Sequence, residues 1–141
     1  MKPKVLFICT GNVARSQMAE GFLRHYAGDR FEVFSGGLNP SYVRPGVIQV
    51  MREVGIDISH HRSKSIEEFR DQEMDYVITV CDHAAQRCPE FALARERIHW
   101  SVEDPVAPIG DEEAQLAVFR RVRDDLRRRL NDFVATNAVD S

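Results

Sequence analysis

A chain of 141 residues is long enough to form one domain with a hydrophobic core. Its net charge of −3 gives no electrostatic reason to expect nucleic acid or an anionic membrane as a partner. No stretch is long and apolar enough to cross a bilayer, and the N-terminus lacks the pattern of a signal peptide. We therefore expect a single cytoplasmic domain, residues 1–141, whose three cysteines stay reduced.

Short apolar runs alternate along the chain with segments of helical periodicity. The predicted strands are 4–8, 31–37, 75–81 and a weaker one at 97–100. The predicted helices run from Arg15 to just before Gly28, from Pro45 to Gly55, over 66–72 behind a capping box of Ser65 and Glu68, and over 111–135. This alternation predicts an α/β fold with a four-stranded, mostly parallel sheet that is flanked by helices on both faces.

Two of the three cysteines follow predicted strands. Cys9 comes at the end of the first apolar run, and Cys81 comes at the end of the third. Ligands of parallel α/β sheets bind beyond the carboxyl ends of the strands. We therefore expect Cys9 and Cys81 to share one site.

The stretch CTGNVARS, residues 9–16, connects the first strand to the first helix. A loop that enters a helix N-terminus directs several backbone N–H groups at one point, where the helix dipole adds partial positive charge. Gly11 allows a backbone conformation that other residues resist, and Arg15 offers a planar fork that suits a tetrahedral oxyanion. The same field favours the thiolate of Cys9, to which Ser16 can donate a hydrogen bond. The predicted oxyanion-binding residues are Thr10, Gly11, Asn12, Val13, Ala14, Arg15 and Ser16.

A thiolate inside an anion-binding loop is suited to attack phosphorus or arsenic, and the oxygen that leaves then needs a proton. Asp104, in the stretch EDPVA at 103–107, can supply that proton, since the following Pro105 keeps it out of a helix. The alternative is a buried structural cysteine with an Asp-Pro pair that only forms a turn. The order of strand, cysteine, glycine, arginine and helix favours catalysis.

Three stretches resemble one enzyme family. VLFICTGNVARSQMAE, residues 5–20, resembles the low-molecular-weight protein tyrosine phosphatase superfamily, whose signature is Cys, five residues, Arg and Ser. VCDHAAQRCP (80–89) and HWSVEDPVA (99–107) resemble the thioredoxin-coupled arsenate reductases of that superfamily. The resemblance implies a phosphatase-like fold, arsenate as the substrate and thioredoxin as the reductant, with phosphate or sulfate as competing anions.

The resemblance also implies a role for each thiol: Cys9 as the nucleophile, Cys81 as the first resolving thiol and Cys88 as the last. Thioredoxin then reduces a disulfide between Cys81 and Cys88. With Arg15 as the anion clamp and Asp104 as the general acid, these residues form the predicted catalytic set. No cofactor and no metal are expected, because Cys81 and Cys88 are spaced too widely for usual zinc ligands. The protein is expected to be a monomer.

Two other functions stay open. A low-molecular-weight phosphatase that acts on a protein or a small phosphoester needs only Cys9, Arg15 and Asp104. A non-enzymatic thiol sensor of redox state or arsenite needs the cysteines alone. Asp104 speaks against the sensor, whereas Cys81 and Cys88 speak against the plain phosphatase. No aromatic residue follows the Asp-Pro pair to stack against a phosphotyrosine ring.

The chain departs from the reductases at two positions. Val13 stands where they usually carry Ser. Asn12 and Glu20 match a potassium site that some reductases have beside the anion loop, but Lys64 stands in place of its acidic ligand. We expect the Lys64 ammonium to replace the metal ion there. The adjacent histidines at 60–61 are expected to face apart at the surface.

Overall fold

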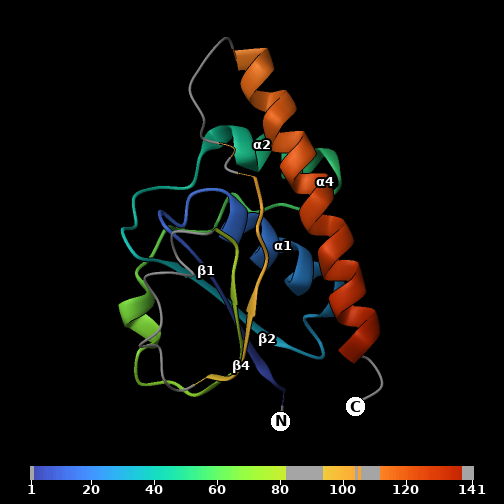
Figure 1. Ribbon diagram of the computed structural model, residues 1–141. Coiled ribbons are helices and arrows are strands. Elements are labelled where there is room, and N and C mark those ends of the chain that lie inside the picture. The colour runs from blue at the N-terminus through green and yellow to red at the C-terminus, as the bar shows by residue number, and fades with distance from the viewer. Residues whose placement is uncertain (1, 82–93, 104, 106–111, 138–141) are drawn as a thin grey trace.

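The computed structural model describes residues 2–81, 94–103, 105 and 112–137 (Figure 1). Four parallel strands form one sheet in the order β2-β1-β3-β4. The strands are β1 Lys4–Cys9, β2 Glu32–Gly37, β3 Met74–Thr79 and β4 Ala94–His99. The helices are α1 Arg15–Ala27, α2 Pro45–Glu53, the 3-10 helix η1 Ile66–Phe69 and α4 Glu112–Asn137. The predicted α/β class with a four-stranded parallel sheet is confirmed.

β1 lies in the centre of the sheet, between β2 and β3, and is almost entirely buried. On one face of the sheet, Phe133 of α4 packs against Tyr76 of β3, with ring centroids 5.3 Å apart. On the other face, Phe34 of β2 packs against Phe69 of η1 at the same centroid distance, 5.3 Å. Tyr76 and Phe34 pair with successive residues of β1, which point to opposite faces. The predicted helical cover on both faces is confirmed.

The long helix α4 forms one layer with α1 and α2. α1 and α2 both pack against it (Figure 1). Arg123 of α4 is 9% exposed and reaches α2, where its NH1 donates to the Val50 carbonyl at 2.9 Å and pairs with Glu53 at 2.9 Å. No helix in the described part of the chain is long and apolar enough to span a membrane. The apolar positions predicted for α4 are all buried, namely Leu116, Phe119, Val122, Leu126, Leu130 and Phe133.

Two strand boundaries differ from the predicted ones by more than one residue. β3 ends at Thr79, two residues before Cys81, and the pairing closes with a hydrogen bond from the Val80 N–H to the Ile8 carbonyl. β4 begins at Ala94, three residues earlier than predicted. This edge strand opens with the exposed charged run 95–97, which hides the apolar pattern of a strand.

The predicted short helix is a single 3-10 turn, and only half of its capping box forms. Ser65 Oγ accepts a hydrogen bond from the Glu67 N–H at 3.1 Å, as a cap should. Glu68 does not complete the box; its two carboxylate oxygens pair with Arg62 at 2.7 and 3.0 Å. A bidentate, charge-assisted pair is stronger than the hydrogen bond to a backbone amide that the box would offer.

Candidate active site

The loop between β1 and α1 turns its carbonyl groups away from its own centre. Segment 38–44 runs beside it, and Ser63 Oγ donates to the Gly11 carbonyl at 2.8 Å. In a trans peptide the next N–H points opposite to the carbonyl, so the loop N–H groups turn inward and can surround an anion. Ala14, the N-cap of α1, makes no side-chain cap hydrogen bond. The backbone N–H groups of Leu38, Asn39, Ser41 and Arg44 donate to the carbonyls of Cys9, Thr10, Gly11 and Val13, respectively.

The residue of the loop with an unusual backbone conformation is Asn12. The prediction that Gly11 adopts this conformation is wrong. Asn12 has φ 53°, in the left-handed region that Asn adopts more readily than most residues. The only described glycine with a positive φ is Gly55, which ends α2 as predicted. The turn at Asn12 brings its N–H within 3.2 Å of Cys9 Sγ.

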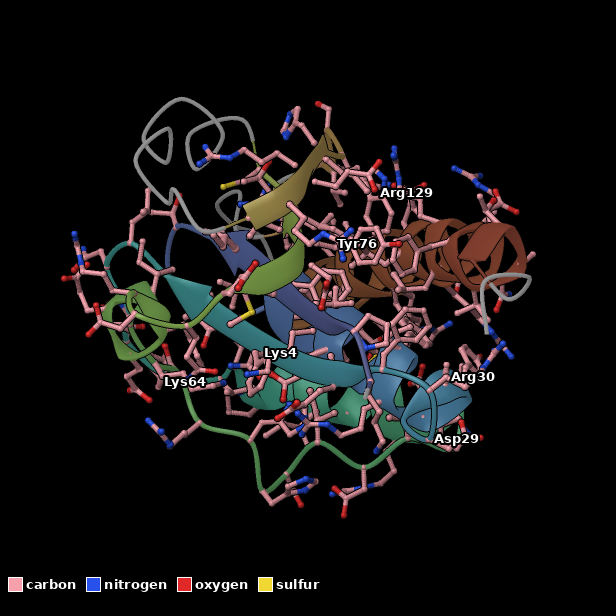
Figure 2. The ribbon with its side chains drawn as sticks, turned by 90° about the horizontal axis from the view of Figure 1, so that it is seen from below. Lys4, Asp29, Arg30, Lys64, Tyr76 and Arg129 are labelled. Atoms are coloured by element: carbon pink, nitrogen blue, oxygen red, sulfur yellow. The ribbon has the colours of Figure 1, made fainter. Side chains whose placement is uncertain are left out.

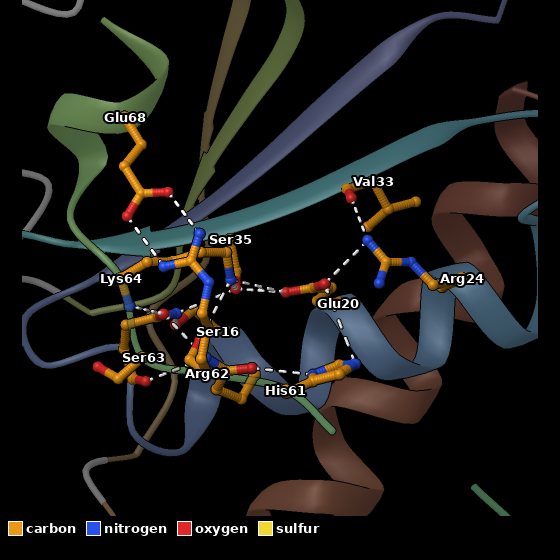
Figure 3. A network of polar contacts seen from close by, with 12 residues as sticks. Ser16, Glu20, Arg24, Val33, Ser35, His61, Arg62, Ser63, Lys64 and Glu68 are labelled. Atoms are coloured by element: carbon orange, nitrogen blue, oxygen red, sulfur yellow. Dashed lines mark hydrogen bonds and ion pairs between the residues drawn. The ribbon is translucent and has the colours of Figure 1, made fainter. Parts of the chain in front are cut away.

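A chain of side-chain hydrogen bonds decides which proton faces the sulfur of Cys9; Figure 3 shows its Ser16, Ser35 and Glu20 members. Asn12 Nδ2 donates to Ser16 Oγ at 2.7 Å and to Ser35 Oγ at 3.0 Å. Because Ser16 accepts from Asn12, its own proton is free to point at Cys9 Sγ, 2.8 Å away. Ser35 in turn donates its proton to Glu20 Oε1 at 2.5 Å. The Ser16 hydroxyl and the Asn12 N–H therefore both face the sulfur.

Glu20 is 3% exposed and anchors the far end of this chain among basic groups (Figure 3). Arg24 pairs with its Oε2 at 2.9 Å, and Lys64 Nζ lies 3.5 Å from its Oε1. The backbone N–H of Lys64 also donates to Asn12 Oδ1 at 2.9 Å. Burial lowers the pKa of Lys64, and the Glu20 carboxylate opposes that shift. The structure thus brings Asn12, Glu20 and Lys64 together, as expected from the sequence.

Ser35 and two other members of the network were not anticipated. Gln17 Nε2 donates to Asn12 Oδ1 at 2.8 Å and so fixes the orientation of that amide. Gln17 Oε1 lies 2.9 Å from Nδ1 of His61, whose side chain is only 4% exposed. The expected surface position of His61 is therefore wrong, and its ring contacts that of His60 with centroids 4.8 Å apart. Burial lowers the pKa of His61.

Cys81 lies directly against the anion loop. Its Sγ is 3.4 Å from Thr10 Oγ1, and Thr10 follows Cys9 in the chain. Cys9 and Cys81 are both buried. The two strand-end cysteines therefore meet at one loop, as expected. Cys88 lies outside the described residues.

Arg15 connects the anion loop with the segment that follows β4. Its NH1 donates to the Val102 carbonyl at 3.1 Å. Val102 precedes Asp104 by two residues, and Asp104 itself lies outside the described residues. Among the described residues, no group of three His, Cys, Asp or Glu side chains is placed to hold a metal ion.

The arrangement of cysteine, anion loop and arginine has counterparts among known proteins. The sequence profile of the family described as low molecular weight phosphotyrosine protein phosphatase matches residues 4–140. The chain belongs to this family. An arsenate reductase of Halalkalibacterium halodurans, a relative of the chain, is 44% identical over 135 residues, which cover 96% of this chain and 97% of that protein.

Solved structures share the fold of this family member. One titled as an arsenate reductase in the phosphate binding state has a TM-score of 0.80 and 39% identity, and the match covers 96% of this chain and 98% of that one. A thioredoxin-dependent arsenate reductase of Corynebacterium glutamicum has a TM-score of 0.77 and 27% identity, over 99% of this chain and 64% of that one. The predicted low-molecular-weight phosphatase-like fold is confirmed.

Proposed function

We propose that the protein is an arsenate reductase that uses three thiols and is regenerated by thioredoxin. The observation that carries the proposal is the position of Cys81, whose Sγ lies 3.4 Å from Thr10 Oγ1 at the loop that begins with Cys9. A phosphatase needs one thiolate at such a loop, whereas a reductase needs a second thiol within reach. The relatives named as arsenate reductases support the same reaction.

The proposed reaction begins with the Cys9 thiolate in the loop of N–H groups and the Arg15 guanidinium, which hold arsenate. Sγ of Cys9 attacks arsenic and forms a sulfur–arsenic bond, while an oxygen of arsenate leaves as water with a proton from Asp104. Ser16 and the Asn12 N–H hold the thiolate for this attack.

Reduction of arsenic takes the two electrons of the sulfur–arsenic bond. The Cys81 thiolate attacks Cys9 Sγ, the bond to arsenic breaks with its electron pair on arsenic, and arsenite leaves. Arsenic(V) has become arsenic(III), and two thiolates have become one disulfide. Cys88 then attacks Cys81, which releases the Cys9 thiolate and forms a Cys81–Cys88 disulfide. A dithiol protein such as thioredoxin reduces that disulfide and is itself oxidised.

One chain supplies every group in this proposal, so the reaction needs no second copy and we take the active species to be a monomer. Its thiols must be free at rest, which suits a reducing compartment such as the cytoplasm. Phosphate and sulfate should compete with arsenate because they share its tetrahedral oxyanion geometry. Hydrolysis of small phosphoesters is the second candidate activity, because the loop, Arg15 and Asp104 are the groups that this reaction needs.

The proposal is tested by two assays on the same variants. Arsenite formation is followed with thioredoxin, thioredoxin reductase and NADPH, and phosphatase activity is followed with p-nitrophenyl phosphate. Cys9→Ser should abolish both activities, because both begin with its thiolate. Cys81→Ser and Cys88→Ser should abolish repeated arsenate turnover and keep the hydrolysis of the ester. Normal repeated turnover of arsenate by either of these two variants would show that the three-thiol relay is wrong.

A further inference from the structure

The segment that follows β4 is anchored through Trp100. The Trp100 N–H donates to the Thr79 carbonyl at 2.9 Å, and its ring packs against Phe7 and Phe133 with centroids 6.3 Å away in each case. Two residues later, Val102 is 6% exposed, and its carbonyl accepts the hydrogen bond from Arg15. These contacts fix one side of the segment against the core and the anion loop.

Helix α4 holds the same segment from its other side through three side chains. Arg121 makes a bidentate ion pair with Glu103, in which Nε lies 2.8 Å from Oε1 and NH2 lies 2.5 Å from Oε2. Gln115 Nε2 donates to the Pro105 carbonyl at 2.5 Å. Arg129 NH2 donates to the Ser101 carbonyl at 3.3 Å. Glu103 and Pro105 are the two residues that flank Asp104 in the sequence.

Charged side chains also contact one another along the helix face that makes these contacts. Arg121, Asp125 and Arg129 follow one another at intervals of four residues and so lie on one side of α4. The Asp125 carboxylate accepts from Arg129 Nε at 3.3 Å, which orients that guanidinium toward Ser101. Figure 2 shows Arg129 on the side of α4 that faces β4.

We propose that Arg121 and Gln115 are positioning residues: they hold Glu103 and Pro105, which flank Asp104 in the sequence, and thereby favour proton transfer from Asp104. The inference rests on the proposed function, in which Asp104 is the general acid. A general acid must lie within hydrogen-bond reach of the atom it protonates. Loss of the contacts at Glu103 and Pro105 therefore slows proton transfer, while the thiolate, the anion loop and the fold stay intact.

The Arg121–Glu103 pair is suited to such a role and is a poor candidate for a purely stabilising one. The two side chains are 60% and 48% exposed, and pairs in that setting add little to stability. Their two parallel hydrogen bonds, however, restrict direction as well as distance. The hydrogen bonds from Arg121 lower the pKa of Glu103.

The test compares substrates that need the proton to different extents. The leaving group of p-nitrophenyl phosphate departs readily without a proton, whereas that of phenyl phosphate and the hydroxyl of arsenate need one. Arg121→Gln and Gln115→Ala should lower kcat/KM about tenfold for phenyl phosphate and arsenate, and much less for p-nitrophenyl phosphate. Arg121→Lys should recover part of the loss, because it restores the charge without the fork. The double variant Glu103→Gln with Arg121→Gln should be no slower than either single variant.

Arg120→Gln is the matched control, because it removes a similar pair on the same helix. Arg120 NH2 lies 2.7 Å from Glu53 Oε2, and this pair joins α4 to α2 instead of the segment after β4. Arg120→Gln should leave the ratio of the three substrates unchanged. An equal ratio for Arg121→Gln and the unaltered protein would overturn the positioning role. A lack of arsenate turnover by the unaltered protein would instead overturn the proposed function, while the ratio of the two esters would still test the positioning role.

Discussion

At the scale of single residues, Lys64 places a fixed cation among oxygen atoms beside the anion loop. Its Nζ lies 3.5 Å from Glu20 Oε1, 3.2 Å from Ser35 Oγ and 3.3 Å from the Arg62 carbonyl. Because an ammonium already fills this position, exchange of sodium for potassium at constant ionic strength should leave the rate of arsenate reduction unchanged. Lys64→Asp replaces the cation by an acidic ligand and should make the rate rise as potassium is added.

Steady-state rates in sodium chloride and in potassium chloride measure this response for both proteins. Lys2→Asp controls for the change in net charge, because Lys2 is exposed and donates to the Gly28 carbonyl at 3.0 Å, away from the anion loop. Strong activation of the unaltered protein by potassium would contradict the expected role of Lys64.

The sequence predicted the residues of the site that carry a linear pattern and missed those that only the fold brings together. The Cys-to-Arg spacing and the order of strand, loop and helix are local, so the loop could be placed from them. Ser35 lies in β2 and meets Asn12 and Glu20 only through the register of β2 on β1. His61 was expected at the surface because adjacent side chains tend to face apart, but this segment is a loop that folds over α1.

At the scale of elements, α2 meets α4 through a glycine. A Cβ on Gly46 would lie 2.7 Å from Cε2 of Phe119, whose ring is 3% exposed and held in the core. Gly46→Ala should therefore lower the free energy of unfolding by about 1–3 kcal/mol, because overpacking outweighs the gain in helix propensity. Urea unfolding measures the change.

Two variants check this interpretation of the contact. Gln49→Ala lies on the exposed side of α2 and should leave the free energy of unfolding nearly unchanged. Phe119→Leu makes room at the contact, so Gly46→Ala should cost less in that background than in the unaltered protein. Equal stability of Gly46→Ala and the unaltered protein would show that α2 and α4 can move apart at no cost to make room for the added methyl group.

Helices and strands could be predicted where their buried side chains follow a regular apolar pattern. They were harder to predict where exposed charged residues interrupt that pattern. β1 is apolar because it is buried on both faces, and the apolar side of α4 recurs at helical spacing along its whole length. The start of β4 was predicted too late because an edge strand can carry charged side chains. The capping box did not form at Glu68 because the Arg62 side chain, which lies in the preceding loop, binds the carboxylate that the box needs.

At the scale of the whole molecule, carboxylates join separate elements to one another. Hydrogen bonds from Arg120 and then from Arg123 lower the pKa of Glu53 from 4.5 to about 2, and this pairing joins α2 to α4. The pKa of Glu103 is lowered in the same way by Arg121, but this pair is exposed and adds little to stability. A carboxyl group with a lowered pKa binds fewer protons in the folded state than in the unfolded state. Its contribution to stability is therefore complete above pH 4.5 and is lost as pH falls toward the folded value.

His61 adds a second pH range with the same sign. Burial holds the pKa of its imidazole below the ordinary 6.5, so the folded state favours the neutral ring. The contribution is complete above pH 6.5 and is lost as pH falls below that value. The groups that face the ring are Glu20, Gln17, His60, Arg24 and Lys64. The free energy of unfolding should therefore decline in two steps on acidification, the first below pH 6.5 and the second below pH 4.5.

Urea unfolding at intervals between pH 7.5 and pH 2.5 separates the two steps with one variant for each. His61→Gln keeps a hydrogen-bonding group but cannot take up a proton, so it should remove the first step and keep the second. Glu53→Gln should be less stable than the unaltered protein at pH 7, and the difference should shrink as pH approaches 2, where Glu53 itself becomes protonated. Glu73→Gln, an exposed change, should follow the unaltered protein throughout. A stability difference for Glu53→Gln that stays constant down to pH 2.5 would mean that its pairing with Arg120 and Arg123 does not set the acid limit of the fold.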